Sequence, residues 1–284
     1  MSESKIAITV VVPVKNEEAN LGKCLSRLSR FSEVIVVDSS STDRTPAIAN
    51  EYGANIVNFS WDGKYPKKRN WLLLNVTLRN EWVLFLDADE FVDAAFCDAV
   101  DRATQDPVQC GFWLNYDNFF LGRRLRFGVP QRKLALFRVG KALYEQIDED
   151  HWSGLDMEVH EHPIVDGPVG EIAARIEHKD DRGIIKFVDR HRDYAVWEAH
   201  RIVRLRSSGI ALNKMTRRQR LKYGNLSRWW YPWVYFLFTY FLKFGFLDGS
   251  VGLQYAFYKT WYFQTIRLLI FEGASGHGYR GRPS

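Results

Sequence analysis

The first hundred residues alternate between short apolar runs and segments whose apolar residues have helical spacing. Residues 6–14 read Ile-Ala-Ile-Thr-Val-Val-Val-Pro-Val, a β-branched run typical of a strand covered on both faces. Apolar residues then recur at helical spacing from Leu21 to Leu28, and Asp43 is a candidate N-cap for a second helix. The pattern predicts further strands at 34–37, 56–59 and 82–86 and further helices at 67–78 and 93–104. This order predicts a Rossmann-like α/β sheet with helices on both faces.

The pattern changes after residue 110. Residues 111–178 contain short apolar pieces, Gly and Pro punctuation and many aromatics, which predict irregular strands and loops. Helical periodicity returns over 183–205, and two aromatic segments follow at 229–247 and 251–271. We therefore expect three regions, which are residues 1–110, 111–182 and 183–284.

Charge distribution and cysteine content indicate the binding partner and the cellular compartment. The net charge is only +5, but the stretch between Arg201 and Arg228 has many bases and no Asp or Glu, which indicates a polyanionic partner. Three cysteines without metal-ligand spacing argue against a disulfide framework and favour a reducing, cytoplasmic setting. The first five residues lack the features of a signal peptide, so we do not expect secretion.

Two carboxylates follow the strand at 82–86. Asp87 and Asp89 are one residue apart, so continued strand alternation would put both on one side. Oxygen ligands of this kind suit Mg²⁺ or Mn²⁺, which completes its coordination shell with phosphate oxygens. The alternative is an acidic turn with a helix cap. Because ligands of such sheets lie beyond the carboxyl ends of the strands, we favour the metal site.

Polar residues also follow the two earlier strands. Asn16 and Glu17 come directly after the first strand, where side chains and backbone N–H groups can meet a nucleotide. Asp38 ends the second strand and could accept a hydrogen bond from the N3–H of a uracil. Ordinary helix capping is the alternative for both segments, and we expect it to hold for Asp43 in any case.

A third polar cluster contains several cations at a predicted helix start. Lys67, Lys68 and Arg69 lie where positive charge opposes the helix dipole. A bound anion such as a diphosphate would explain them. A solvated basic loop is the alternative.

Taken together, four segments resemble family 2 glycosyltransferases: Val-Pro-Val-Lys-Asn-Glu-Glu-Ala-Asn-Leu from Val12, Asp-Ser-x-Ser-Thr-Asp-Arg-Thr from Asp38, Pro-Lys-Lys-Arg-Asn-Trp from Pro66 and Leu-Asp-Ala-Asp-Glu from Leu86. The chain looks closest to the bacterial branch similar to lipopolysaccharide-core β-1,4-glucosyltransferases and exopolysaccharide glycosyltransferases. Residues 159–161, 166–170, His178 and 245–249 also echo that branch.

The resemblance implies a GT-A fold, a UDP-sugar donor, Mg²⁺ or Mn²⁺, and inversion at the anomeric carbon. It implies that residues 1–110 bind the nucleotide sugar and that residues 111–182 carry acceptor and catalytic functions. Glu161 of the Val-His-Glu motif is the candidate base, with Asp156, Glu158 and His160 as alternatives. Gln131 and Arg132 stand where the family pattern led us to expect an acidic residue. The same resemblance implies that the nucleotide-sugar contacts are Pro13, Asn16, Glu17, Asp38, Lys68, Arg69 and Asp87. It also implies that the metal ligands are Asp87, Asp89 and His178.

The C-terminal region combines bases with interfacial aromatics. The basic stretch precedes Trp229, Trp230 and Trp233, an arrangement that suits anionic headgroups. Nucleic acid would also suit such residues, but beside a sugar-transfer site we favour a membrane and expect no nucleic acid. Pro232 and Lys243 weaken a spanning prediction, so we expect monotopic or re-entrant helices. Packing of both helices on the catalytic domain is the alternative.

These observations predict an inverting glycosyltransferase that adds a hexose from a UDP-sugar to a lipid-linked glycan in envelope or exopolysaccharide assembly. We expect it at the cytoplasmic face of the inner membrane, as a peripheral or monotopic protein. Transfer to polyprenyl phosphate is the nearest enzymatic alternative, and a non-catalytic membrane scaffold is the alternative from another class. The sugar, the acceptor and the linkage stay open.

Overall fold

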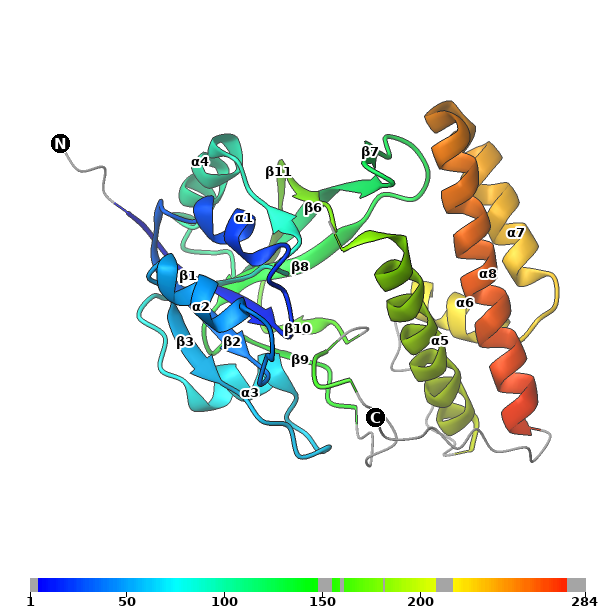
Figure 1. Ribbon diagram of the computed structural model, residues 1–284, viewed down its shortest axis with the longest axis horizontal. Helices are drawn as coiled ribbons and strands as arrows, with labels where there is room; N and C mark the ends of the chain where they lie inside the picture. Colours follow the sequence, from blue (N-terminus) through cyan, green and yellow to red (C-terminus); the bar gives the residue numbers. More distant parts are fainter. Residues whose placement is uncertain (1–4, 148–154, 159–160, 181, 208–216, 275–284) are drawn as a thin grey trace. The chain divides into compact units, whose positions relative to one another are not determined.

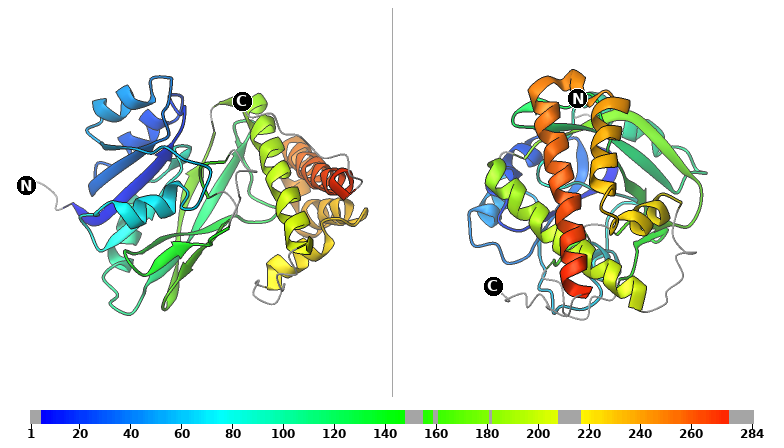
Figure 2. Two further views of the ribbon diagram at one scale, coloured as in Figure 1. Left: turned by 90° about the horizontal axis from the view of Figure 1, so that it is seen from below. Right: turned by 90° about the vertical axis from the view of Figure 1, so that its right-hand side faces the viewer.

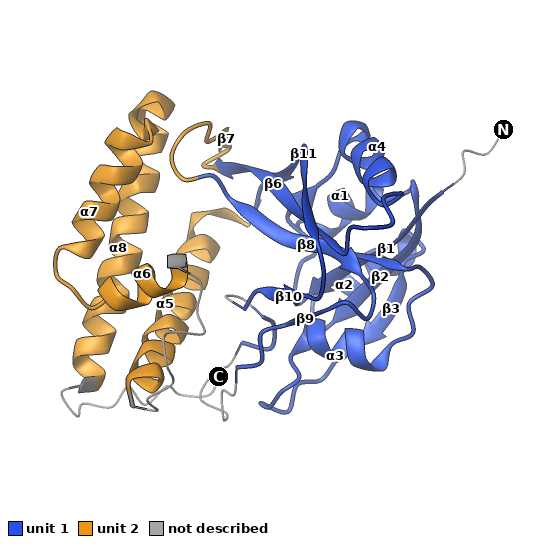
Figure 3. Cartoon of the chain, turned by 180° about the vertical axis from the view of Figure 1, so that it is seen from behind, with its two compact units in different colours: residues 1–119, 130–181 blue, residues 120–129, 182–284 orange. Residues whose placement is uncertain are grey.

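The computed structural model describes residues 5–147, 155–158, 161–180, 182–207 and 217–274. The chain forms two compact units, shown in different colours in Figure 3. Unit 1 contains Met1–Phe119 and Pro130–Asp181, and unit 2 contains Phe120–Val129 and Arg182–Ser284. The predicted division at residues 110 and 182 concerns function and stays a prediction. Residues 120–129 belong to the same compact unit as the C-terminal helices.

One mixed sheet organises unit 1 (Figure 1). Four parallel strands form its first half, because β1 pairs with both β2 and β4, and β2 pairs with β3. The second half is mixed: β8 is antiparallel to both β4 and β6, β11 is parallel to β6, and β5 is antiparallel to β11. The bounds are β1 (Ile6–Val14), β2 (Phe31–Asp38), β3 (Asn55–Asn58), β4 (Trp82–Phe85), β5 (Glu90–Phe91), β6 (Gly111–Phe120), β8 (Arg132–Arg138) and β11 (Val169–His178).

Helices cover both faces of this sheet. The chain moves from β1 through β2 to β3 in one direction along the sheet and then returns to β4, so right-handed crossovers place α3 on the face opposite α1 and α2. In Figure 1, α1 and α4 lie on one side of the strands and α3 on the other. The helices are α1 (Leu21–Ser26), α2 (Thr45–Glu51), α3 (Lys68–Asn75) and α4 (Ala94–Ala103).

The hydrophobic core follows the apolar runs. Val10, Val11 and Val12 of β1 are fully buried, as expected for a strand with neighbours on both sides and helices on both faces. The predicted α/β class is therefore confirmed. Two local predictions were wrong in part. Residues 111–178, expected as irregular strands and loops, include regular strands of the main sheet. The second helix, expected to begin at Asp43, begins at Thr45, but the Asp43 side chain does bind its start, because Asp43 Oδ1 accepts from the Thr45 N–H at 2.9 Å. A small ribbon pairs β9 (Ala142–Tyr144) with β10 (Pro163–Val165).

Unit 2 is mainly helical. Helices α5 and α8 pack against each other, as the views of Figure 2 show, around a core that includes Ala195, Ile202 and Ile266. Residues 208–216 of the basic stretch and 275–284 of the tail lie outside the described residues. The elements are β7 (Arg123–Arg124), α5 (Gly183–Ser207), α6 (Arg217–Asn225), α7 (Tyr231–Leu237), the π-helix η2 (Phe238–Leu242), the 3₁₀ helix η3 (Gly245–Asp248) and α8 (Gly249–Ala274).

A sharp bend separates α7 and η2 from η3 and α8. Phe244 has φ +58° at the break, and a Cβ on Gly252 would lie 2.1 Å from the carbonyl oxygen of Gly245. Only glycine therefore allows this close packing. Among the described helices, none is by itself long and apolar enough to cross a membrane. By length and composition, the pair formed by Tyr231–Leu242 and Gly245–Gly273, bent by 72°, could do so.

Candidate active site

The predicted nucleotide loops lie next to each other at the carboxyl ends of β1 and β2. Val14 and Asp38, the last residues of these strands, are paired in register. Asn16 has φ +55°, and its Oδ1 accepts a hydrogen bond from the Thr42 N–H at 2.8 Å. Asp38 in turn accepts from the N–H and the hydroxyl of Ser41. Asn16 and Asp38 thus shape these loops, and their contact with a nucleotide stays a prediction.

Pro13 and Glu17 flank this loop. Pro13 lies within β1, opposite Val37. The backbone carbonyl of Glu17 accepts from the N–H groups of Asn20 and Leu21, and its side chain accepts from Asn20 Nδ2 at 3.0 Å. Glu17 therefore stabilises the turn that leads into α1, and its contact with a nucleotide stays a prediction.

Each cation at the start of α3 is paired with a carboxylate of the chain itself. Lys67 Nζ lies 3.1 Å from Glu161 Oε1, and both side chains are buried. Arg69 Nη2 lies 2.7 Å from Asp87 Oδ1. Lys68 Nζ lies 3.3 Å from Asp156 Oδ2 and donates to the carbonyl of Val14 at 3.0 Å. The alternative of a solvated basic loop does not hold for these three residues.

A carboxylate also occupies the amino end of α3. Glu158 accepts hydrogen bonds from the N–H of Arg69 at 2.9 Å and of Asn70 at 3.0 Å, and its backbone carbonyl accepts from the Arg69 guanidinium. Its carboxylate thereby caps the amino end of α3, interacts favourably with the helix dipole and offsets the positive charge of the neighbouring cations. The need for an anion at this helix start is thus met within the chain. Contacts of Lys68 and Arg69 with a diphosphate stay a prediction.

Asp87 and Glu90 share one lysine. Lys133 Nζ on β8 lies 2.6 Å from Asp87 Oδ2 and also contacts Glu90 Oε1. Burial opposes ionisation of Asp87, but Lys133 and then Arg69 outweigh it and hold its pKa well below the ordinary value. Burial raises the pKa of Glu90 above its ordinary value. Asp87 is therefore a firmly ionised carboxylate between two cations.

Asp89 faces a different partner. Its Oδ2 lies 3.4 Å from His178 Nε2, and the other ring nitrogen of His178 is 3.0 Å from Asn118 Oδ1. Burial disfavours the imidazolium, but the Asp89 carboxylate outweighs it and raises the pKa of His178. The main chain of Asp89 is fixed as well, because its carbonyl accepts from the Lys179 N–H at 2.9 Å. The structure therefore brings two of the three predicted metal ligands together.

The donor set fits a divalent cation only in part. Among the described residues, no group of three or more His, Cys, Asp or Glu side chains could hold a metal ion. Mg²⁺ is commonly held by one or two protein carboxylates and takes its other ligands from water and substrate phosphates. Asp89 and His178 suit such a site, with Asp87 bound to Arg69 and Lys133 beside them. The prediction that strand alternation continues through Asp87 and Asp89 was wrong, since β4 ends at Phe85.

The candidate base lies in a buried ion pair. Glu161 is 5% exposed, and its Oε1 is held by Lys67. Hydrogen bonds in a ligand-free site often rearrange when substrate binds, so this geometry is compatible with a later role as base. Of the alternatives, Asp156 pairs with Lys68 and Glu158 caps α3, whereas His160 lies outside the described residues.

Sequence reasoning missed Lys133. This lysine binds the carboxylates of Asp87 and Glu90 after β4. It lies in β8, directly after residues 131–132, where the family pattern led us to expect an acidic residue. A lysine directly before the buried apolar residues 134–137 of this strand was a signal for a buried partner. The identity of that partner depends on the pairing of β4 with β8.

Comparisons with known proteins show the family of the chain. Residues 9–155, which are 147 of 284 and so just over half of the chain, match the family described as glycosyl transferase family 2. The chain is 25% identical over 281 residues to the lipopolysaccharide core biosynthesis glycosyltransferase LpsC of Rhizobium meliloti (strain 1021), covering 89% of this chain and 90% of the relative. It is 26% identical over 257 residues to an uncharacterized glycosyltransferase of Rickettsia felis, covering 86% and 83%.

A solved structure supports the fold. The mannosyltransferase PcManGT from Pyrobaculum calidifontis, in complex with GDP-Man and Mn²⁺, superposes with a TM-score of 0.51 at 15% identity, covering 94% of this chain and 87% of that chain. At this identity the likeness concerns the fold alone. With the family match, it confirms the predicted GT-A architecture.

Proposed function

Because this chain belongs to glycosyl transferase family 2, we propose that it transfers a hexose from a UDP-sugar to a lipid-linked glycan, with inversion at the anomeric carbon. The acceptor would belong to the assembly of the bacterial envelope or of an exopolysaccharide. One observation carries the proposal: paired and largely buried carboxylates and cations gather around the carboxyl ends of β1 and β4, and all but Asp156 lie in the family-matching segment. A scaffold without catalytic function would not need this concentration of buried charge.

The residues of unit 1 suggest how the donor would be held. Asn16 and Asp38 lie at adjoining loop starts, where a nucleoside could contact both. Arg69 and Lys133, both bound to Asp87, are the cations available to a diphosphate. Asp89 and His178 would hold Mg²⁺ or Mn²⁺, which, when bound, would neutralise charge on the departing diphosphate.

Transfer with inversion requires one base. The acceptor hydroxyl oxygen forms a bond to the anomeric carbon while the bond from that carbon to the diphosphate oxygen breaks. The leaving oxygen keeps the electron pair, and the acceptor proton passes to a carboxylate, for which we propose Glu161. Lys67, 3.1 Å from one oxygen of Glu161, would orient the base. Transfer to a polyprenyl phosphate would need no such base, since a phosphate oxygen is already ionised.

A membrane setting is part of the proposal. Trp229 and Leu242 are 69% and 70% exposed, and Phe241, Phe246 and Leu247 also face outward in unit 2. Such exposed apolar side chains next to a basic stretch favour binding to a membrane interface. The relative LpsC is named for lipopolysaccharide core biosynthesis, which suits an acceptor in a membrane. We therefore propose a peripheral or monotopic protein at the cytoplasmic face of the inner membrane.

A transfer assay tests the proposal. The purified chain with Mn²⁺ is incubated with UDP-glucose, UDP-galactose or their N-acetyl forms and with lipid-linked glycans from envelope-deficient bacterial strains. We expect one donor to give a glycosylated lipid whose new linkage has the anomeric configuration opposite to that of the donor. Absence of product with every UDP-sugar and folded protein would contradict the donor class. Product with undecaprenyl phosphate as sole acceptor, retained in Glu161→Gln, would favour transfer to phosphate instead.

A further inference from the structure

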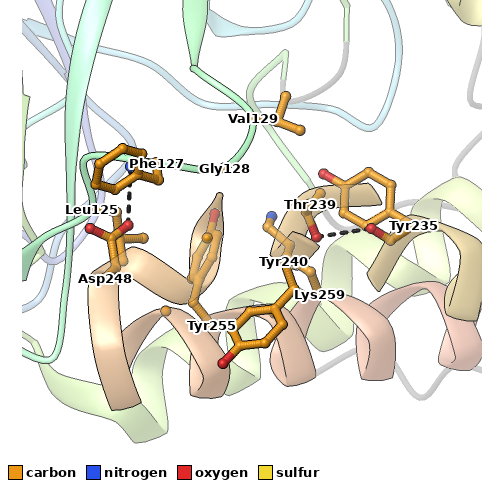
Figure 4. Close-up of a pocket in the computed structure, with 13 residues that line it drawn as sticks. Leu125, Phe127, Gly128, Val129, Tyr235, Thr239, Tyr240, Asp248, Tyr255 and Lys259 are labelled. Carbon is orange, nitrogen blue, oxygen red and sulfur yellow. Dashed lines mark hydrogen bonds between the residues drawn. The ribbon is translucent and has the colours of Figure 1, made fainter. Parts of the chain in front are cut away.

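A pocket lies wholly within unit 2 (Figure 4). Aromatic residues form much of its wall, and the loop at 125–129 closes one side of it. Thr239 of η2 and Gly245 of η3, on either side of the bend, line the pocket, and α8 contributes Tyr255 and Lys259. The pocket is therefore built from three segments that meet at the bend.

The only carboxylate among the lining residues is engaged by the backbone. Asp248 Oδ1 accepts from the N–H of Arg126 and Oδ2 from the N–H of Phe127, each at 3.1 Å. These bonds tie the loop to η3, and Figure 4 shows the one to Phe127. Because both oxygens already accept hydrogen bonds, Asp248 serves the architecture of the pocket.

Lys259 has no such partner. Within the described part of the chain, its Nζ forms no hydrogen bond or ion pair, and its contacts are the ring faces of Tyr255 and Tyr262, each 5.6 Å from Nζ. Its pKa lies below the ordinary value because burial disfavours the charge; Tyr235 opposes this effect, and Arg190 adds to it. An unpaired cation in a partly buried pocket is unfavourable unless an anion binds there.

The surroundings of the pocket indicate which kind of anion. Phe127, a lining residue, is 40% exposed, and Phe241 and Leu242 on η2 are 52% and 70% exposed. A small soluble anion would leave these apolar side chains in water. A lipid would place its phosphate at the lysine and its chains against the aromatic side chains.

We propose that this pocket binds the phosphate group of a lipid, with Lys259 as the charged contact and the aromatic walls as the contact for the lipid chain. The inference concerns unit 2 and does not depend on the transfer reaction proposed for unit 1. Binding of UDP to the same protein therefore shows separately whether the proposed function holds.

Titration calorimetry of the full chain with short-chain, monomeric lipids tests the proposal. We expect saturable binding of dihexanoyl phosphatidic acid that Lys259→Met weakens about tenfold or more, because a charge-assisted contact is lost. Lys243→Met removes an exposed lysine outside the pocket and is the matched control, expected to change the affinity less than about twofold because solvent and salt screen an exposed charge. Inorganic phosphate should bind about tenfold more weakly than the lipid, since it makes no apolar contact.

Three results would overturn the proposal. The first is equal affinity of the native chain and Lys259→Met for the lipid, and the second is an equal loss in Lys243→Met, which would indicate unspecific attraction. The third is inorganic phosphate binding as tightly as the lipid, which would indicate a soluble phosphate ligand. Thermal unfolding without ligand controls for folding: Lys259→Met should be as stable as the native chain or more stable, because it removes an unpaired charge. A marked loss of stability would instead assign Lys259 a structural role.

Discussion

Lys133 Nζ on β8 lies 2.6 Å from Asp87 Oδ2, and the same ammonium group contacts Glu90. One lysine thus holds two of the three acidic side chains that follow β4. Because Arg69 binds the other oxygen of Asp87 at 2.7 Å, this carboxylate links the start of α3 to β8. These ion pairs therefore both position the side chains of the candidate site and balance their charge.

Removing the shared lysine should destabilise unit 1. In Lys133→Met, Glu90 stays buried without its cation, and we expect a loss of about 3 kcal/mol in the free energy of unfolding. Urea denaturation measures this loss. The matched control is Arg132→Met, whose exposed pair with Glu171 should contribute less than about 1 kcal/mol. Equal effects of the two variants would contradict the role given to Lys133.

Glu158 should matter for the stability of unit 1. In Glu158→Ala, the N–H groups of Arg69 and Asn70 at the start of α3 lose their acceptor, and we expect a loss of about 2 kcal/mol in the free energy of unfolding. Glu158→Gln keeps an acceptor for the helix start and should lose less. Denaturation curves compare the two variants. A smaller loss in the alanine variant than in the glutamine variant would contradict the capping role.

The base assignment predicts a separation of catalysis from binding. Glu161→Gln should lower kcat by about a hundredfold or more, because a general base typically contributes a factor of this size. The Kd for UDP should change less than about threefold, since the carboxylate acts on the acceptor proton. Steady-state kinetics and calorimetry give the two values. Unchanged kcat with a glycan acceptor would move the base to another residue.

Membrane association should depend on the exposed apolar side chains of η2. Replacing Phe241 and Leu242 by serine should weaken binding to vesicles containing anionic lipid by about tenfold or more, because each side chain contributes about 1.5–3 kcal/mol when fully buried. Ile164→Ser, at a 67% exposed position in unit 1, is the control and should have little effect. Vesicle co-sedimentation measures the difference. Equal binding by the double variant would contradict insertion of η2.

Local patterns in the sequence were sufficient to predict the parallel half of the sheet. The β-branched runs fixed β1, β2 and β4 within a few residues, because buried strands need continuous apolar side chains. The later strands β6, β8 and β11 were expected as irregular pieces. Polar residues interrupt the apolar residues of β6 and β11, and the regularity of the three strands comes from their pairing with one another.

The composition of the candidate site was predicted better than its contacts. Asp87, Asp89 and Arg69 were identified from their positions near strand and helix ends, where ligands of such sheets bind. Their partners lie far along the chain: Lys133 is 46 residues from Asp87, and Glu158 is 88 residues from Asn70. Such pairings follow from strand order and loop paths, which local periodicity does not encode. The pairing of the cations at the start of α3 with carboxylates of the chain is therefore visible only in the folded structure.

Metal-dependent donor binding tests the central claim most directly. Calorimetry measures the affinity of the full chain for UDP with Mn²⁺ and with EDTA, for the native chain, for Asp89→Ala and for the control Asp98→Ala, whose carboxylate pairs with Arg30 on the surface. A glycosyltransferase site of the kind proposed predicts UDP binding that weakens by about tenfold or more in EDTA or in Asp89→Ala and is unchanged in Asp98→Ala. Binding of equal strength in all conditions and variants, or no binding by the folded native chain, would contradict it.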